Sequence, residues 1–442
     1  MPMQGRILRA NDPDYDEHRR SFNGMLDRRP AAVALVESVE DVLAAMDVAR
    51  AEDLRIAVRG GGHSVAGHGL LDDGLVIDLR RMRGVEIDPA TRRARVQGGA
   101  TWEDFDNAAQ AHGLAVTGGT FVDTGVGGLA LGGGIGFLLG SQGLTCDNIV
   151  GAQLVTADGA LREVNAETDP DLLWALRGGG GNFGIATRLD FTVHHVGAMC
   201  GDSVLLGLGD GSVIGQLARV MAKAPDTFVA LAYVANREEF GPSVSIHIAS
   251  LADEESTRPL YDEILRDARV IRAGFRPLTY AEVQGFAGNL PFGLRHYWKS
   301  AFVPDLSDAV VGEIVDMVER PRPDPGSNTG ILLEPIHGQA RRYGFDHAAF
   351  PQRAARWHVS ALGIWENEAA DEQEIAWVRE THRRVSSLGT TGTYSNYITH
   401  EEPADRARST WPPDVLARLR AVKRRVDPEN VFRSNLNIPP TG

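Results

Sequence analysis

Cysteine is scarce in this sequence, and long apolar runs are missing from it. Cys146 and Cys200 are the only cysteines among 442 residues, too few for a disulfide scaffold or a four-cysteine zinc site. No apolar run reaches the roughly 18 residues that a membrane-spanning helix needs. The opening stretch, MPMQGRILRANDPDYDEH, lacks the apolar core of a signal peptide. We therefore expect a cytoplasmic protein with no membrane span.

Positive charge is also in short supply. The formal net charge at pH 7 is -14, so general attraction to nucleic acid or to anionic lipid is not expected. The composition leaves a small molecule as the expected partner. A chain of 442 residues is longer than one typical domain, and we expect two.

Glycine, in contrast, is abundant and clustered. The sequence contains 50 glycines, and many of them gather in three windows, residues 60–69, 118–136 and 178–184. Clustered glycine indicates backbone that adopts positive φ or approaches a ligand closely. A single window would fit an ordinary tight turn. Three windows in the first half of the chain favour a long ligand that lies against the backbone.

The first window lies between two predicted strands. The stretch SVEDVLAAMDVARAEDL before it has the periodicity of an amphipathic helix, with Ser38 and Asp41 spaced as a capping box. RIAVRG and GLVIDLRRM, on either side of the loop, have the composition of strands. A Walker A loop needs Gly-Lys-Ser/Thr at the start of a helix, and this loop has neither. Its free N–H groups are typical of a nest for a pyrophosphate, and Arg59 is expected to assist as a charged donor.

The second and third windows leave alternatives open. Residues 125–130 match G-x-G-x-x-A, with Asp147 further on, as in a Rossmann fold that binds NAD. Two features count against that interpretation: the preceding FVDT is a poor buried strand, and glycine continues through Gly136, where a helix should be under way. The third window has the pattern of a short helix, a glycine loop and a strand, which also fits a plain turn.

The order of five motifs is more specific than any of them alone. RGGGHS, GVGGLALGGGIGFLLGSQGLTCDN, DLLWALRGGGGNFGI, YSNY and VDPENVFRSNLNIPP follow one another over nearly the whole chain. In this order they resemble the berberine-bridge-enzyme-like oxidases, FAD-dependent members of the vanillyl-alcohol-oxidase superfamily. The resemblance implies an α+β protein with a PCMH-type FAD-binding domain made of two α+β subdomains.

The second half of the chain has a different texture. Beyond about residue 198 alternating strand patterns occur between helical patterns, as in an antiparallel sheet backed by helices. We expect residues 1–197 to form the first part of the FAD-binding domain and residues 198–410 to form the substrate domain. The resemblance implies that residues 411–442 return to the FAD-binding domain.

The resemblance assigns a role to His63, the histidine of RGGGHS. In this family the histidine at that place is bonded to the 8α-methyl carbon of FAD, and neutral imidazole is a nucleophile at pH 7. A non-covalent flavin contact and a metal site shared with His68 are the alternatives, and we expect no metal. The residues expected to bind FAD are Arg59, Gly60, Gly61, Gly62, His63, Ser64, Gly67, His68, Thr124, Gly125, Gly128, Leu129, Gly132, Gly133, Gly136, Cys146, Asn148, Gly184, Ile185, Asn396, Asn435 and Asn437.

Two positions depart from the family pattern or refine it. Many relatives attach FAD a second time through a cysteine, and Phe121 occupies that place, so we expect a single attachment. Thr124 stands at the family's oxygen gate, where bulky Leu or Ile accompanies poor use of oxygen. Thr has the shape of Val, which favours an oxidase that uses O2 over a dehydrogenase with another acceptor.

The motif YSNY carries the expected chemistry. Its second tyrosine, Tyr397, matches the catalytic base of many members, and an alcohol can pass hydride to flavin only as its hydroxyl proton leaves. Free tyrosine has a pKa of about 10, so the site must lower it by positive charge or hydrogen-bond donors. Lys299 and Arg295 are the predicted sources of charge. Tyr394 and Asn396 are expected to shape the pocket, and Lys299 is expected to line the substrate pocket together with Tyr394.

Alternatives to this assignment remain. Both tyrosines of the motif also fit the packing of an amphipathic strand, and a carboxylate base is represented by Glu401 and Glu402. We predict an FAD-dependent oxidase of a hydroxyl-bearing small molecule, a sugar or a natural-product alcohol, with an amine-bearing ring also open. A flavin dehydrogenase, an NAD-dependent enzyme and a flavin-binding protein without turnover are the rivals. A monomer or a homodimer is expected.

Overall fold

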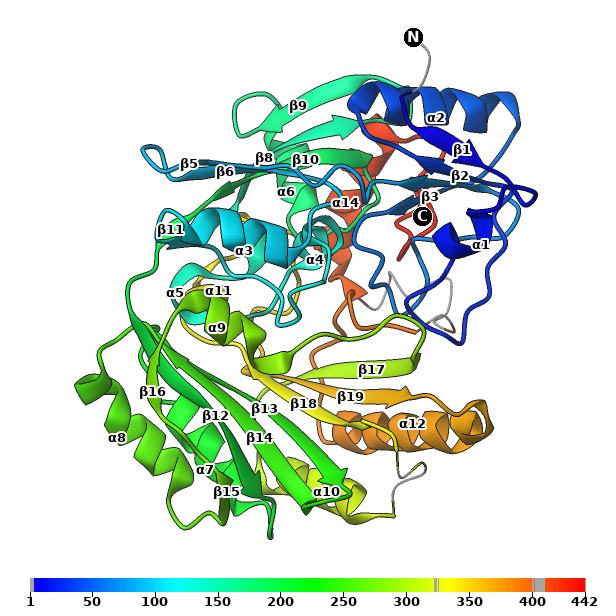
Figure 1. Ribbon diagram of the computed structural model, residues 1–442. Coiled ribbons are helices and arrows are strands. Elements are labelled where there is room, and N and C mark those ends of the chain that lie inside the picture. The colour runs from blue at the N-terminus through cyan, green and yellow to red at the C-terminus, as the bar shows by residue number, and fades with distance from the viewer. Residues whose placement is uncertain (1–3, 322–323, 325, 400, 402–409, 442) are drawn as a thin grey trace.

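The computed structural model describes residues 4–321, 324, 326–399, 401 and 410–441, and it contains three main sheets (Figure 1). The first sheet has the order β1-β2-β4-β3 and is mixed: β2 and β3 run parallel to β4, and β1 runs antiparallel to β2. Its strands are β1 (Arg6–Leu8), β2 (Ala32–Leu35), β3 (Ile56–Arg59) and β4 (Leu75–Asp78).

Helix α2 (Val39–Ala51) packs on this first sheet, through apolar side chains such as Val42 and Met46. Ser38 caps it, because its side chain accepts a hydrogen bond from the backbone N–H of Asp41. The carboxylate of Asp41 does not return to Ser38 as a capping box requires. It accepts instead from the N–H groups of Gln4, Gly5 and Glu37, and so fixes the entry of the chain into β1.

The second sheet is antiparallel, with the order β5-β6-β10-β8-β9. Its strands are β5 (Val85–Asp88), β6 (Arg93–Gln97), β8 (Ile149–Val155), β9 (Leu161–Asn165) and β10 (Ile185–Thr192). The helices in this part of the chain are α1 (Tyr15–His18), α3 (Trp102–Gln110), α4 (Val126–Gly132), α5 (Leu139–Gln142) and α6 (Pro170–Leu176). Two short strands, β7 (Leu114–Ala115) and β11 (His194–His195), pair with each other.

The third sheet is the largest and is antiparallel throughout, with the order β15-β12-β14-β13-β18-β19-β17 and β16 paired to β12. Its strands are β12 (Met199–Gly207), β13 (Phe228–Arg237), β14 (Gly241–Ser250), β15 (Val270–Arg272), β16 (Arg276–Leu278), β17 (Arg295–Val303), β18 (Gly330–Pro335) and β19 (Trp357–Trp365). The helices of this region are α7 (Ser212–Met221), α8 (Glu254–Leu265), α9 (Tyr280–Gln284), α10 (Asp308–Glu319), α11 (Gln339–Arg342) and α12 (Asp371–Ser387). Helices α7, α8, α10 and α12 lie on one face of this sheet, and the other face turns toward the first part of the chain (Figure 1). The predicted α+β class, with an antiparallel sheet backed by helices, is confirmed.

The end of the chain lies against its beginning. Helix α14 (Pro413–Val426) packs on α6, and the ion pairs Arg418–Asp171 and Arg425–Asp169, each 2.6 Å, join the two helices (Figure 1). Within the described ranges, no helix has both the length and the apolar character needed to cross a bilayer.

Candidate active site

A single cavity gathers parts of all three glycine windows. There they meet strand β17, the loop at residues 394–398 and the C-terminal segment at residues 432–436. The predicted site residues that line this cavity are Arg59, Gly60, Gly61, Gly62, His63, Ser64, His68, Thr124, Gly125, Gly128, Leu129, Gly132, Tyr394, Asn396, Tyr397 and Asn435. The predicted residues that are not part of its wall are Gly67, Gly133, Gly136, Cys146, Asn148, Gly184, Ile185, Lys299 and Asn437.

Close backbone contact explains the glycines of the first loop. A Cβ atom on Gly61 would overlap the backbone nitrogen and Cα of Gly125, and a Cβ on Gly125 would overlap Gly61 in return. Gly62 adopts φ +86° directly over the Arg59 side chain. The loop at residues 60–69 is therefore pressed against the start of α4, where a larger side chain would separate the two segments.

Arg59 lines the cavity, but its guanidinium is already engaged. It donates to the backbone carbonyls of His18 and Arg20, at 2.7 and 2.8 Å. Burial lowers its pKa to about 10, so it stays charged at neutral pH. These contacts give no support to the expectation that this guanidinium serves a pyrophosphate. The Arg59 side chain ties the N-terminal segment to the end of β3, where the glycine loop begins.

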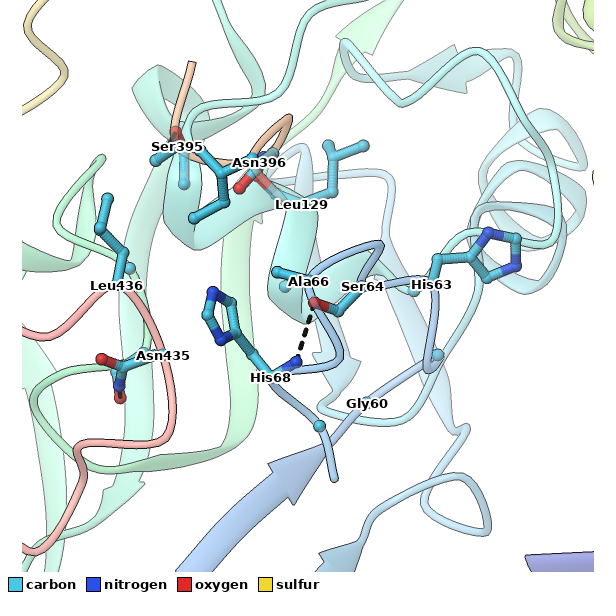
Figure 2. A pocket seen from close by; sticks show the side chains of 18 of the residues that line it. Gly60, His63, Ser64, Ala66, His68, Leu129, Ser395, Asn396, Asn435 and Leu436 are labelled. Atoms are coloured by element: carbon cyan, nitrogen blue, oxygen red, sulfur yellow. Dashed lines mark hydrogen bonds between the residues drawn. The ribbon is translucent and has the colours of Figure 1, made fainter. Parts of the chain in front are cut away.

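The two histidines of the loop point to opposite sides of it (Figure 2). The His68 backbone N–H donates to Ser64 Oγ at 3.1 Å, while its ring is buried and Nε2 has no partner among the described residues. Burial lowers the pKa of His68 to about 4. The divergent rings give no support to a metal ion shared by His63 and His68. No group of three or more His, Cys, Asp or Glu among the described residues is arranged to hold a metal ion.

His63 sits among aromatic rings and one carboxylate. Its ring stacks on Phe22, with centroids 4.4 Å apart, and meets the edge of Phe292 at 5.4 Å. Its Nε2 lies 3.2 Å from Oδ2 of Asp123. Only 9% of the His63 side chain is exposed, so contacts with neighbouring side chains fix the orientation of its ring.

The YSNY loop is fastened to the end of helix α4. The backbone N–H of Gly134 donates to the Tyr394 hydroxyl at 2.7 Å, and the Asn396 amide donates to that hydroxyl and to the carbonyl of Leu129. Ser395 Oγ donates to the carbonyl of Gly132. Tyr394 and Asn396 therefore position the loop, and the tyrosines lie in a turn rather than in an amphipathic strand.

Tyr397 faces the cavity beside Trp298, whose ring centroid is 5.1 Å away. The surrounding protein raises the pKa of Tyr397 well above 10, chiefly because burial disfavours the phenolate, and the negative charge of Glu334 adds to the effect. The expected lowering of this pKa is therefore wrong in the structure. The phenol is protonated at neutral pH.

Neither predicted cation lies near Tyr397. Arg295 pairs with Asp371 at the start of α12, and the Lys299 amine lies over the ring of Tyr297, 5.9 Å from its centroid. Lys299 is next to Trp298 in β17, so alternation along the strand directs the two side chains to opposite faces. The substrate-pocket role predicted for Lys299 is thus not supported.

The predicted carboxylate bases gain no support either. Glu401 accepts hydrogen bonds from the Tyr297 hydroxyl and from Arg379 on the α12 side of the sheet, away from the cavity. Glu402 lies outside the described residues.

Cys146 and Asn148 are structural in this fold. The Cys146 thiol is buried beside Asp147, and burial raises its pKa, so it is an unreactive thiol. The Asn148 amide donates to the carbonyls of Gln142 and Leu144, and its oxygen lies 2.8 Å from His194 Nε2. These contacts close the turn between α5 and β8.

The remaining predicted glycines serve packing. A Cβ on Gly136 would overlap the carbonyl of Gly118, and one on Gly133, at φ +136°, would meet the Phe350 ring. Gly67, at φ +74°, leaves room for Leu26. Gly184 leads into β10, where Ile185 pairs with Val155 of β8, and Asn437 lies beyond the cavity wall with its Oδ1 buried.

The cavity wall fits a long dinucleotide such as FAD. Five polar atoms of its lining residues are buried without a hydrogen-bond partner among the described residues: His63 Nε2, His68 Nε2, Asn435 Oδ1 and the indole nitrogens of Trp298 and Trp411. Buried polar atoms normally make hydrogen bonds, so these atoms are suited to bind the polar groups of a ligand. In Figure 2, His68 and Asn435 lie on either side of the same space.

Several residues of the site escaped sequence reasoning. Glu334 and His358 form a buried pair, 2.6 Å apart, and His358 Nε2 lies 3.1 Å from Ser360 Oγ. The His358 ring is 5.3 Å from that of Tyr397. The pair joins adjacent strands β18 and β19, and no local motif announces it. Trp411 and Asp123 also carried no signal beyond their residue type.

Comparisons with known proteins agree with this architecture. Residues 30–165 match the FAD binding domain family, and residues 393–439 match the berberine and berberine like family. The chain is 30% identical to an uncharacterized FAD-linked oxidoreductase, YgaK, of Bacillus subtilis, over 99% of this chain and 97% of that protein.

Solved structures show the same fold. The crystal structure of 6-hydroxy-D-nicotine oxidase from Arthrobacter nicotinovorans is similar with a TM-score of 0.90 and 29% identity, over 99% of this chain and 98% of that one. Glucooligosaccharide oxidase from Acremonium strictum is similar in fold, with a TM-score of 0.87 and 23% identity over 99% and 98% of the two chains.

Proposed function

Because this chain belongs to the berberine-bridge-enzyme-like FAD-linked oxidoreductases, we propose that it is an oxidase of a hydroxyl-bearing small molecule. Bound FAD supplies a hydride acceptor that dioxygen can reoxidise, with hydrogen peroxide as the product. The observation that carries this proposal is the position of His63 and Tyr397 in the wall of one cavity. One residue holds the cofactor, and the other handles the substrate proton.

His63 is the proposed point of covalent attachment, through the 8α carbon of FAD. The glucooligosaccharide oxidase is described with 6-S-cysteinyl, 8α-N1-histidyl FAD. This chain has a histidine in the matching loop, but Phe121, which lines the cavity, stands where the resemblance places the cysteine. A phenyl ring cannot form such a bond, and we propose one attachment only.

Tyr397 is the proposed acceptor of the hydroxyl proton. An alcohol becomes a carbonyl compound when its carbon loses a hydride and its oxygen loses a proton, so a base must reach that oxygen. Tyr397 has its ring in the cavity, and its loop is fixed to α4 by Asn396. Because the resting phenol is protonated, the phenolate must form before or during hydride transfer, which makes the reaction faster at alkaline pH.

Thr124 favours dioxygen as the acceptor. Its side chain lines the cavity at the place that the resemblance gives to the oxygen gate, and it is smaller than Leu or Ile. A small side chain leaves room for O2 beside the cofactor. A dehydrogenase with another acceptor is the alternative that this residue disfavours.

The reaction end of the cavity favours a natural-product alcohol over a sugar. Leu290, Trp298, Phe121 and Tyr397 line it and belong to one apolar cluster. A sugar bound there would bury several hydroxyl groups without partners, which costs free energy for each of them. The buried indole nitrogen of Trp298 has no partner among the described residues, and it offers one donor to a substrate oxygen.

The division of labour between the parts of the chain is also a proposal. Residues 1–197 and 411–442 would bind FAD, and residues 198–410 would bind substrate. The contact of α14 with α6 and the presence of Trp298 and Tyr397 in the same cavity wall as the glycine loops support it.

The experiment is an anaerobic titration of the purified holoprotein. Benzyl alcohol, a larger aromatic secondary alcohol and cellobiose are added in turn, and the visible flavin absorbance is recorded before and after air is admitted. An oxidase of apolar alcohols is bleached by the aromatic alcohols, regains its colour in air and forms one peroxide per substrate. Recovery only with an artificial acceptor would mean a dehydrogenase, and bleaching by cellobiose alone would overturn the substrate class.

A further inference from the structure

The neighbourhood of His63 contains a residue that the cofactor proposal does not use. Asp123 places Oδ2 at 3.2 Å from His63 Nε2, and its other oxygen, Oδ1, is buried without a partner among the described residues. Asp123 is only 30% exposed, so water does not fully compensate its charge. A half-buried carboxylate this close to an imidazole can orient the ring and stabilise positive charge on it.

The fold brings these two side chains together from independent directions. Asp123 lies in the turn at residues 121–124, which the first turn of α3 holds: the N–H groups of Trp102 and Glu103 donate to the carbonyls of Thr124 and Val122, at 3.0 and 2.8 Å. Those N–H groups have no partner within their own helix, so the turn satisfies them. Asp123 is therefore presented on a fixed support.

His63 is presented from the other side by the glycine loop. The backbones of Gly61 and Gly125 touch, which sets the loop against the end of the turn that carries Asp123. The stack of His63 on Phe22, itself stacked on His296 at 4.4 Å, keeps the imidazole from swinging away. The approach of the two side chains thus follows from two rigid backbone contacts.

We propose that Asp123 positions and activates His63 for covalent attachment of FAD; the inference rests on that attachment. The carboxylate lies 3.2 Å from Nε2 without the alignment of a hydrogen bond, and its negative charge favours a proton on that nitrogen, which leaves the lone pair of Nδ1 to attack. Aspartate orients the histidine of serine-protease triads in the same way and stabilises its imidazolium form. Asp123 is a positioning residue, since it acts through His63.

The step balances with dioxygen as the oxidant. A C–N bond forms between Nδ1 and the 8α carbon, the methyl C–H bond breaks, and the Nε2 proton leaves through Asp123. The electron pair of the broken C–H bond reduces the isoalloxazine by two electrons, and the two released protons balance its charge. Dioxygen then reoxidises it and is itself reduced to hydrogen peroxide. The carboxylate stabilises the positive charge that develops on the imidazole as the bond forms.

The test measures attachment itself rather than turnover. Wild type, Asp123→Asn, Asp123→Glu, His63→Ala and Glu103→Gln are purified after identical expression, and each is analysed by denaturing mass spectrometry and for acid-released FAD. Glu103 is exposed in the same neighbourhood, and its backbone N–H donates to the turn at Val122, so it is the matched control. We expect Asp123→Asn to attach FAD about 10- to 100-fold more slowly while it still binds FAD that acid releases. Asp123→Glu and added formate restore part of the rate, and Glu103→Gln matches wild type.

Other outcomes separate this inference from the proposal beneath it. No covalent FAD in the wild type would remove the attachment itself. Covalent FAD in the wild type and equally in Asp123→Asn would leave His63 in its role and overturn that of Asp123. Loss of both bound and attached FAD in Asp123→Asn and Asp123→Glu alike would make Asp123 a structural residue, which also overturns the inference.

Discussion

His63 and His68 stand on one loop, yet their surroundings differ in every respect that matters for chemistry. His63 has a carboxylate at 3.2 Å, a stacked phenyl ring and a place in the cavity wall. His68 is buried with no partner for Nε2 and has a pKa lowered to about 4. The first environment orients a nucleophile, and the second keeps an imidazole neutral as a hydrogen-bonding group. The role of each histidine is therefore set by the residues that other segments place around it, and not by the residue type alone.

The largest predicted effect is on covalent FAD, when each of these histidines is replaced by alanine. His63→Ala is expected to abolish covalent FAD completely, because no other nucleophile in the loop has an activating partner. His68→Ala is expected to keep the covalent bond and to lose only one hydrogen bond to the cofactor. Flavin fluorescence of the protein band on a denaturing gel compares the two variants directly. A fluorescent band of normal intensity in His63→Ala would show that His63 does not carry the covalent FAD.

The next effect concerns proton removal from the substrate. Tyr397→Phe should slow reduction of the flavin by substrate by about 10²- to 10⁴-fold, as expected for the loss of a general base. Attachment of FAD should be unchanged, because removal of the substrate proton plays no part in forming the bond to His63. Stopped-flow bleaching under anaerobic conditions measures the first quantity, and denaturing mass spectrometry measures the second. A variant that reduces its flavin at the wild-type rate would exclude Tyr397 as the base.

The pH dependence sharpens the contrast between proton removal and FAD attachment. Burial and the charge of Glu334 raise the pKa of Tyr397 well above 10, so its phenolate fraction at neutral pH is small and rises about tenfold for each pH unit. The rate of flavin reduction should therefore increase with pH up to at least about pH 10, and this slope should vanish in Tyr397→Phe. A plateau reached near pH 7 would point to a different base.

The smallest predicted effect tests the backbone contact that holds the His63 loop against the turn of Asp123. Gly61→Ala forces a Cβ into Gly125 and should lower the free energy of unfolding by about 1–3 kcal/mol. Gly312 is the control: it is exposed in α10, and a Cβ there meets nothing within 4 Å. Gly312→Ala should stabilise the protein by about 0.5–1 kcal/mol. Urea unfolding of the two variants measures both changes in the free energy of unfolding. Equal changes in the two variants would show that the Gly61–Gly125 contact does not stabilise the protein.

Much of the framework was readable in the sequence because it depends on local rules. The Ser38 cap, the strands on either side of the first glycine loop and the strands and helices of the third sheet follow from periodicity and turn residues. The motif order also located the cavity wall, including His63, Tyr397 and Asn435. These features need only neighbours in the chain or a known pattern.

The errors arose where segments distant in sequence meet. Lys299 was expected near Tyr397, but strand alternation turns it to the other face once Trp298 faces the cavity. Arg59 was expected to bind phosphate, but its partners are carbonyls of the N-terminal segment. The Glu334–His358 pair depends on the register of β18 and β19, which no single segment encodes.

Denaturing mass spectrometry of the wild-type protein, followed by peptide mapping, tests the central claim most directly. The account predicts that each chain carries one FAD, which survives unfolding and maps to the peptide that contains His63. A chain with the mass of the bare polypeptide, or an FAD mapped to any other residue, would contradict it.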